Sequence, residues 1–209
     1  MATLALWLWA LYGLLAFALR VAIHLRRTGE SGLRGVTGRP GSVEWLAGVG
    51  FVAAIALGVA APVLALADAV EPIDALHRTW LHALGIVLYG AGLIGVVFAQ
   101  GTMGGSWRVG VDESERTALV TTGPFSVVRN PIYTTMLAAV TGLAMLVPSV
   151  VSIAALVLLV MSLEAQTRVV EEPYLLRTHG DAYAGYANRV GRFVPRFGRL
   201  RPGSPADPS

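Results

Sequence analysis

The stretch L-V-T-T-G-P-F-S-V-V-R-N-P-I-Y, residues 119–133, joins a polar connection to a long apolar run. Gly123-Pro124 is typical of a turn. Asn130 followed by Pro131 predicts the start of a helix, because asparagine caps helices well and proline at the first helical position loses no needed hydrogen bond. The free N–H donors of a helix start, with Arg129 beside them, suit a carboxylate or a phosphate. The same residues also fit an interfacial arginine next to an ordinary cap.

The apolar run that follows decides the fold. It extends from Pro131 to Leu163 and is too long for one ordinary membrane span. Pro148 and Ser149 divide it into two runs of about 15 to 17 residues, each long enough to cross only a thin or tilted path. We therefore expect a tight helical hairpin embedded in a membrane.

Composition places the whole chain in a membrane. The 209 residues are 55% hydrophobic and only 14% charged, whereas soluble domains carry roughly 25% charged residues. The absence of cysteine excludes disulfides, thiolate metal sites and a cysteine nucleophile. All 16 basic residues are arginine, which excludes Schiff-base chemistry and a P-loop lysine. The four histidines show no metal-ligand spacing, and no compact basic domain indicates binding to nucleic acid, so neither a metal nor a nucleic acid is expected.

Three further apolar segments, residues 4–25, 44–67 and 80–99, are long enough to span a bilayer as helices. With the hairpin they predict an all-α integral membrane protein of about five transmembrane helices. Arg20, at the end of the first segment, is expected to reach the same interface as the next arginines rather than to face inward. Glycines should let a neighbouring helix approach the third segment closely, and they are Gly85, Gly90, Gly92 and Gly95.

The distribution of arginine predicts the orientation. Arginines concentrate in the loop 24–42, in the connection 100–130 and in the C-terminal region, whereas the loop 68–79 holds only Arg78. Because cytoplasmic loops are enriched in arginine, we expect the N-terminus outside and the C-terminus in the cytoplasm of a plasma or inner membrane. The stretch 119–133 and the C-terminal segment would then lie on the same, cytoplasmic side.

The C-terminal segment, residues 168–195, carries a second polar cluster. Arg168, Glu171 and Glu172 are three and four residues apart, so they share one face of a helix. Adjacent carboxylates at a membrane boundary are unfavourable unless they bind a cation or pair with arginine. An ion pair between Arg168 and Glu172 on a solvated face accounts for the spacing without any ligand.

Together, the two stretches closely resemble the isoprenylcysteine carboxyl methyltransferase family, which groups with the membrane-embedded phospholipid methyltransferases. The family pattern is G-P-Y/F-x-x-x-R-H-P-x-Y-x-G, a helical hairpin, E-E-x-x-L, G-x-x-Y-x-x-Y and a closing R-F-x-P. This chain follows the pattern in order over about residues 85–197. It departs at Asn130, where the family has histidine, and at Thr135, where the family has glycine. The imidazole that could act as a base is therefore absent from the motif.

Hydropathy, composition and the resemblance together divide the chain into three parts. Residues 1–79 would form two N-terminal transmembrane helices with their loops, residues 80–197 a methyltransferase core with a cytoplasmic cofactor-binding cap, and residues 198–209 a disordered tail.

The resemblance implies S-adenosylmethionine as methyl donor, held between the hairpin and the C-terminal segment. The helix start with Arg129 suits its carboxylate, and Glu171 or Glu172, with Glu172 favoured, suits its ammonium group. Aromatic faces suit its sulfonium or adenine. The residues expected to contact the donor are Leu119, Gly123, Val128, Arg129, Asn130, Pro131, Tyr133, Glu171, Glu172, Tyr183 and Tyr186. The candidates to orient the substrate are Arg168, Arg189 and Arg192.

The expected function is methyl transfer to a membrane lipid, or to a lipidated or small apolar molecule, that reaches the site sideways from the membrane. A carboxylate acceptor is favoured, because an amine or a thiol must lose a proton and the motif has no histidine to take it. Three alternatives stay open: a phospholipid amine or small thiol as acceptor, a non-enzymatic membrane protein that kept the fold, and a membrane reductase. The reductase would need a glycine-rich phosphate-binding motif, which the sequence does not show. The acceptor and the oligomeric state are not determined by the sequence.

Overall fold

The structure is a computed structural model that describes residues 1–29, 31, 35–104 and 118–200. The described part of the chain consists of helices and irregular turns, which confirms the all-α prediction. Its one isolated pairing of extended backbone joins Val128 to Gly191. Some residues used in the sequence predictions lie outside the described residues: Arg34, Arg108, Arg116 and the tail residues 201–209.

Each predicted span coincides with a helix. The first is continuous and consists of α1 (Ala2–Tyr12), the π-helical η1 (Gly13–Ala18) and α2 (Leu19–Thr28). The next two are α3 (Val43–Leu66) and α4 (Thr79–Met103). After the short 3-10 helix η3 (Gly123–Ser126), the hairpin consists of α5 (Pro131–Leu146) and α6 (Val150–Ala165). The second arm of the hairpin continues without a break through the π-helical η4 (Gln166–Glu171) into α7 (Glu172–Arg189).

Length and composition support membrane insertion. Four of these helical stretches are long and apolar enough to cross a membrane, and α5 is a shorter apolar helix. The predicted end of the third span at residue 99 is wrong, because α4 continues to Met103. Gln100 is tolerated inside the helix since its side-chain amide donates to the carbonyl oxygen of Ala16 at 2.9 Å.

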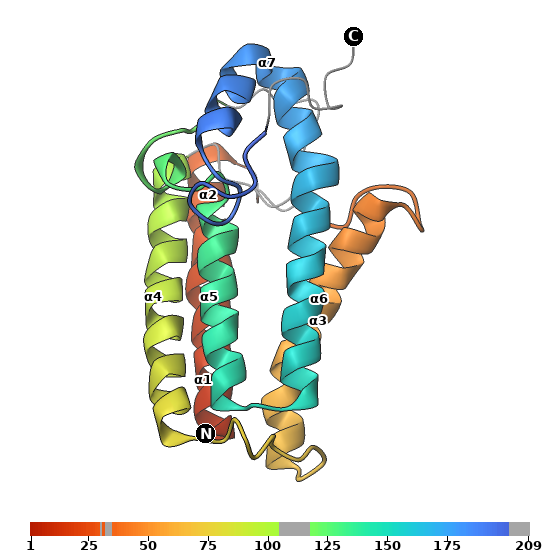
Figure 1. Ribbon diagram of the computed structural model, residues 1–209, viewed down its shortest axis with the longest axis vertical. Coiled ribbons are helices and arrows are strands. Elements are labelled where there is room, and N and C mark those ends of the chain that lie inside the picture. The colour runs from red at the N-terminus through yellow and green to blue at the C-terminus, as the bar shows by residue number, and fades with distance from the viewer. Residues whose placement is uncertain (30, 32–34, 105–117, 201–209) are drawn as a thin grey trace.

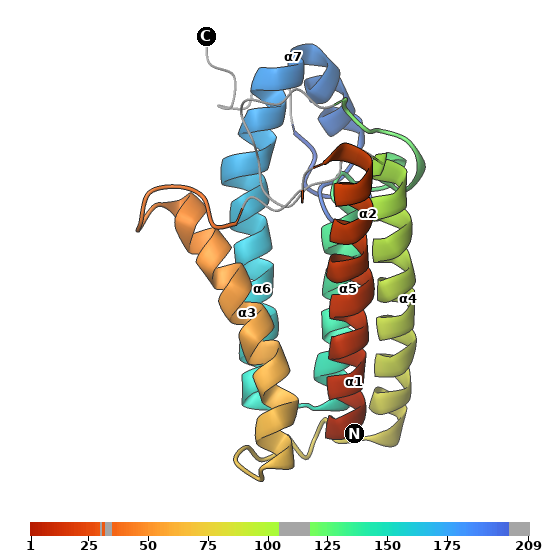
Figure 2. The same cartoon turned by 180° about the vertical axis from the view of Figure 1, so that it is seen from behind.

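The hairpin turn is tight, as predicted. Only three residues separate α5 from α6, and the Ser149 hydroxyl caps α6 by accepting from the Ser152 N–H at 3.2 Å. Beyond the turn, however, the two arms pack against different neighbours, α5 mainly against α4 and α6 mainly against α3. Figures 1 and 2 show the two arms running apart toward α7. The hairpin is therefore closed at its turn and separated at its other end.

Glycines bring α4 and α5 into close contact. A Cβ atom on Gly92 would lie 2.5 Å from the backbone nitrogen of Ala139, and one on Gly142 would lie 2.4 Å from the carbonyl oxygen of Gly85. The predicted close approach at Gly85, Gly92 and Gly95 is thus confirmed, whereas a Cβ on Gly90 would meet nothing within 4 Å. A Cβ on Gly95 would lie 2.5 Å from the methyl group of Thr135, so Thr135 fills the space that this glycine leaves.

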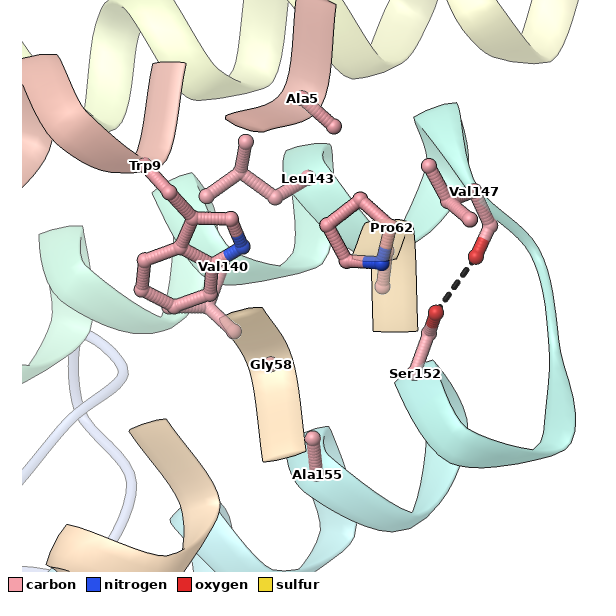
Figure 3. Close-up of a pocket in the computed structure, with 10 residues that line it drawn as sticks. Ala5, Trp9, Gly58, Pro62, Val140, Leu143, Val147, Ser152 and Ala155 are labelled. Carbon is pink, nitrogen blue, oxygen red and sulfur yellow. Dashed lines mark hydrogen bonds between the residues drawn. The ribbon is translucent and has the colours of Figure 1, made fainter. Parts of the chain in front are cut away.

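The end of the bundle that holds the N-terminus and the hairpin turn is closed. Trp9 from α1 packs on Gly58 of α3, where a Cβ would lie 2.6 Å from the indole ring. Figure 3 shows this region, in which Trp9, Leu143 and Pro62 surround a void of about 10 Å³. At the turn, the Ser152 hydroxyl donates to the carbonyl oxygen of Val147 at 2.5 Å. A void of this size holds about one water molecule, so it is too small for a larger ligand.

The expectation that Arg20 reaches the interface is wrong. Its side chain is only 7% exposed, and its guanidinium donates to the carbonyl oxygen of Gly104 at 2.5 Å. Gly104 is the C-cap of α4, and carbonyl groups at a helix end have no partner within the helix. Arg20 therefore joins the first span to the end of α4 instead of turning toward solvent.

Candidate functional site

A cavity of about 470 Å³ lies at the end of the bundle where the hairpin arms separate. Its walls come from η1, α3, the start of α5 and the end of α6, and α7 contributes a further side. Several residues expected to contact a donor line it: Leu119, Arg129, Asn130, Pro131, Tyr133, Glu171, Tyr183 and Tyr186. The two sequence motifs, separated by the hairpin, thus meet at one cavity.

Backbone pairing holds the two motifs together. The N–H groups of Arg129 and Asn130 donate to the carbonyl oxygens of Gly191 and Arg192 at 2.8 and 3.0 Å. Gly191 is required there, because a Cβ atom would lie 2.1 Å from the carbonyl oxygen of Val194. The helix does start at Pro131, as predicted, but the Asn130 side chain does not cap it. Its amide donates instead to the Arg192 carbonyl oxygen at 3.3 Å, since the neighbouring chain supplies an acceptor.

Arg129 is 5% exposed and uses most of its donors within the fold. Its Nη1 donates to the carbonyl oxygens of Ala187 and Val190 at 3.0 and 2.6 Å. Its Nη2 donates to Glu172 Oε1 at 2.5 Å and to the carbonyl oxygen of Gly198 at 3.0 Å. Only the buried Nε of Arg129 has no hydrogen-bond partner. The guanidinium fork therefore ties the end of α7 to the start of α5.

The hydrogen bond from Arg129 reaches Gly198, the first residue of the predicted disordered tail. Leu200 also joins the fold, because its N–H donates to the carbonyl oxygen of Ala187 at 3.1 Å. The described residues Gly198 and Leu200 thus contact the fold, within the segment 198–209 that the sequence predicts to be a disordered tail.

Glu172 holds two arginines. Arg192 donates to it in a bidentate arrangement, from Nε to Oε1 at 2.7 Å and from Nη2 to Oε2 at 2.8 Å. Hydrogen bonds to Glu172 raise the pKa of Arg192 further above its ordinary range, so Arg192 stays charged at any physiological pH. Glu172 is 5% exposed and is not among the residues that line the cavity. We call Arg129, Glu172 and Arg192 the buried ion cluster.

Glu171, in contrast, lines the cavity. The Tyr133 hydroxyl donates to its Oε1 at 2.5 Å, which joins α5 to the end of η4. The structure thus separates the adjacent carboxylates, with Glu172 in the buried ion cluster and Glu171 at the cavity. The π-helical stretch that ends at Glu171 contributes to this arrangement. A π turn holds more residues than an α turn, so it changes the direction in which the following side chains point.

The π-helical η4 also explains why the predicted ion pair between Arg168 and Glu172 is wrong. Arg168 does not pair with Glu172 but with Glu164, four residues earlier, with Nε and Oε2 at 2.9 Å. Its side chain is 60% exposed, so this is an ordinary surface ion pair. Arg189 is also exposed, and neither arginine lines the cavity. Of the three arginines expected to orient a substrate, only Arg192 is buried, and Glu172 occupies its guanidinium.

Aromatic residues complete the cap. The rings of Tyr183 and Tyr186 meet edge to face at a centroid distance of 6.1 Å. The Tyr186 hydroxyl donates to the carbonyl oxygen of Phe125 at 2.6 Å, so it fixes α7 over η3. Gly123, whose φ of +59° favours glycine, begins η3. Val128 is buried beside Gly191, and neither Gly123 nor Val128 lines the cavity.

Sequence reasoning missed part of the lining. The first two spans contribute to it, and the residues not foreseen include Phe17, Glu44, Phe51, Gln100, Gln166 and His179. Glutamine inside an apolar span was a usable signal at position 100, because an uncharged polar group in a membrane helix needs a partner. Among the described residues, no group of three or more His, Asp or Glu side chains is placed to hold a metal ion.

The comparison with known families gives this arrangement a context. Residues 80–182 match the phospholipid methyltransferase family. The match covers just under half of the chain, so this segment is similar to members of that family. The match begins in the first turn of α4 and includes the start of α5, the hairpin and both glutamates.

Two relatives are similar over a shorter part. The chain is 32% identical over 124 residues to the nickel-cobalt-cadmium resistance protein NccN of Alcaligenes xylosoxydans xylosoxydans, covering 59% of this chain and 55% of that protein. It is 30% identical over 124 residues to the cobalt-zinc-cadmium resistance protein CzcN of Cupriavidus metallidurans, with the same coverage of 59% and 55%. The chain thus spans about half the length of these curated relatives.

Proposed function

We propose that this chain is an S-adenosylmethionine-dependent methyltransferase that binds its donor in the cavity beside α7. One observation carries the proposal: both family motifs line a single cavity of about 470 Å³, a volume within the range usual for small-molecule sites. A purely structural bundle has no need to bring Arg129, Tyr133 and Glu171 to such a cavity.

The residues present fit the chemical groups of the donor. Glu171 offers a carboxylate to the ammonium group, and Tyr133 holds that carboxylate in place. The positive charge of Arg129 and the helix start at Pro131 suit the donor carboxylate. The tyrosine faces of the cap suit the sulfonium and the adenine. In this proposal Glu172 is a positioning residue, because it fixes Arg129 and the cap instead of touching the donor.

The protein's contribution to catalysis is positioning. Methyl transfer is a direct displacement in which the acceptor attacks the methyl carbon as the bond to sulfur breaks. The rate then depends on holding the two molecules in line and away from water. The apolar walls from α3 and α5, including Phe51 and Met136, suit a lipidic or small apolar acceptor.

The acceptor group can be argued from the charges. A carboxylate acceptor, as expected from the resemblance, calls for an arginine to orient it. Among the described residues that line the cavity, Arg129 is the only arginine, and its fork is already engaged. Glu44 and Glu171 contribute acidic groups to the same lining. This balance favours a second candidate, an acceptor with an amine or a thiol group.

The orientation proposed from the sequence also has support. Most of the described arginines lie in segments at the end of the bundle that carries α7, namely the end of α2, the loop before α3 and the segment from η4 to residue 199. Arg78 lies at the other end, in the loop before α4. By the positive-inside rule, the end with the cavity faces the cytoplasm.

Calorimetric titration of S-adenosylmethionine into the purified chain in detergent tests the proposal. We expect saturable binding that weakens about tenfold or more in Glu171→Gln, because a charge-assisted hydrogen bond contributes about 1.5–3 kcal/mol. Glu71→Gln, in an exposed loop at the other end, is the matched control and should bind like the wild type. Absence of binding by the wild-type chain, or equal affinities of the wild type and Glu171→Gln, would contradict the proposal.

A further inference from the structure

His179 is the one histidine among the described cavity-lining residues. It lies in α7, just before Gly180, whose backbone leaves the helical region at φ 49° and ψ −129°. Glu171, Leu175 and His179 are four residues apart in turn, so they share one face of the helix. All three line the cavity. The geometry of α7 therefore presents a carboxylate and an imidazole to the same space.

We propose that His179 is the base that removes the proton from the methyl acceptor, and that the acceptor is consequently an amine or a thiol. The proposal rests on the donor site proposed above. Asn130 stands where the family motif has histidine, so this motif supplies no imidazole. His179, in the C-terminal segment, places an imidazole in the lining of the cavity. An imidazole is the side chain whose protonation ordinarily changes near neutral pH, which suits it to this task.

The spacing along α7 fits the length of the reacting groups. His179 follows Glu171 by eight positions, which is about 12 Å along an α-helix. With Glu171 on the donor's ammonium group, the methyl carbon lies a few bonds further along. An attacking atom in line with it, at about 3–3.5 Å, then lies between the methyl group and the imidazole. In this arrangement Glu171 binds the ammonium group of the donor, and His179 lies next to the attacking atom of the acceptor.

The methyl transfer forms one bond and breaks one. The lone pair of the acceptor nitrogen or sulfur forms a bond to the methyl carbon, and the carbon–sulfur bond of the sulfonium breaks. The bonding pair stays on sulfur, which becomes a neutral thioether in S-adenosylhomocysteine. The proton of the acceptor passes to an imidazole nitrogen of His179 and from there to solvent, because His179 is only half-buried.

Other ionisable groups face the same cavity and would share any dependence on pH. They are Glu44 from α3, Arg129 and Tyr133 from the start of α5, Glu171 at the end of η4, and Tyr174, Tyr183 and Tyr186 from α7. A pH profile therefore has to be compared between the wild type and a variant that lacks only the imidazole.

The test uses the full chain with isotope-labelled S-adenosylmethionine and three acceptor probes. These are vesicles that contain phosphatidylethanolamine for an amine, decanethiol for a thiol, and a farnesylated cysteine for a carboxylate. We expect label on the amine or the thiol. His179→Gln should lower kcat about 100-fold or more while leaving the dissociation constant of S-adenosylmethionine within about twofold. Raising the pH should recover part of the lost rate, because the acceptor then loses its proton without help.

His77→Gln is the matched control, since it makes the same substitution in an exposed loop before α4. It should methylate like the wild type. Label on the farnesylated cysteine alone, or an unchanged kcat in His179→Gln, would overturn the role of His179 while leaving the donor site intact. Failure of the wild-type chain to bind S-adenosylmethionine would be seen in the binding measurement and would contradict the proposed function itself.

Discussion

Glu172→Gln separates a structural role of this residue from a role in ligand binding. The carboxylate of Glu172 accepts from Arg129 at 2.5 Å and from Arg192 at 2.7 and 2.8 Å. The three side chains are only 2–10% exposed. An amide at this position keeps the shape but loses the charge, and its NH2 group faces guanidinium donors. The buried guanidinium groups of Arg129 and Arg192 would then lose the carboxylate that balances their charge.

The expected cost follows from this burial. Removing one partner of a buried ion pair typically destabilises a protein by about 3–5 kcal/mol. Arg192 keeps some compensation from Glu164, whose Oε2 lies 3.6 Å from its Nη1, while Arg129 keeps only carbonyl acceptors. For a chain of this size, about 2–4 °C of Tm correspond to each kcal/mol, so we expect a fall of roughly 6–20 °C.

Thermal unfolding of the purified chain in detergent measures the effect. Arg168→Gln is the control, because it removes the exposed ion pair with Glu164, worth about 1 kcal/mol or less, and leaves the contact between Glu164 and Arg192 in place. Limited proteolysis should also cleave the segment 187–200 faster in Glu172→Gln, since Arg129 holds it through Ala187, Val190 and Gly198. If Glu172→Gln melts like the wild type but loses affinity for S-adenosylmethionine, the reasoning is wrong and Glu172 is a ligand.

Three further predictions concern packing and the cap. Gly92→Ala should lower stability by about 1–3 kcal/mol in thermal unfolding, because its Cβ would lie 2.5 Å from a backbone nitrogen, whereas Gly90→Ala meets nothing and should not. Gly180→Ala should cost about 1–2 kcal/mol and weaken donor binding in calorimetry, because its φ of +49° redirects α7 over the cavity; equal affinity would exclude that role. Asn130→His should change the free energy of unfolding by no more than about 1 kcal/mol in thermal unfolding, because the Asn130 side chain makes one long bond and caps nothing; a large loss would show that the amide is essential.

Much of the architecture could be predicted because its causes are local in sequence. Hydrophobic length identified the spans, and the Pro148-Ser149 break identified the hairpin turn. Glycine spacing anticipated the contact between α4 and α5, which depends only on the absence of side chains at Gly85 and Gly92. The meeting of the two motifs was anticipated from the distribution of arginine, which placed both stretches on the same side.

The hydrogen-bond partners within the site could not be predicted, because they depend on how each helix is rotated about its axis and on residues far away in the sequence. The regular α-helical spacing paired Arg168 with Glu172, but the π-helical η4 intervenes and Glu172 is buried instead. Nothing local to Arg20 showed that Gly104, 84 residues away, offers it a carbonyl group. The contribution of α3 to the cavity was likewise hidden, since Phe51 reads as one more apolar residue in a span.

A structure of the purified chain determined with bound S-adenosylmethionine tests the central claim most directly. We predict that the donor occupies the cavity beside α7, with its ammonium group on Glu171 and with the bonds from Glu172 to Arg129 and Arg192 kept. A donor bound outside this cavity, or one whose ammonium group takes Glu172 from the two arginines, would contradict the account.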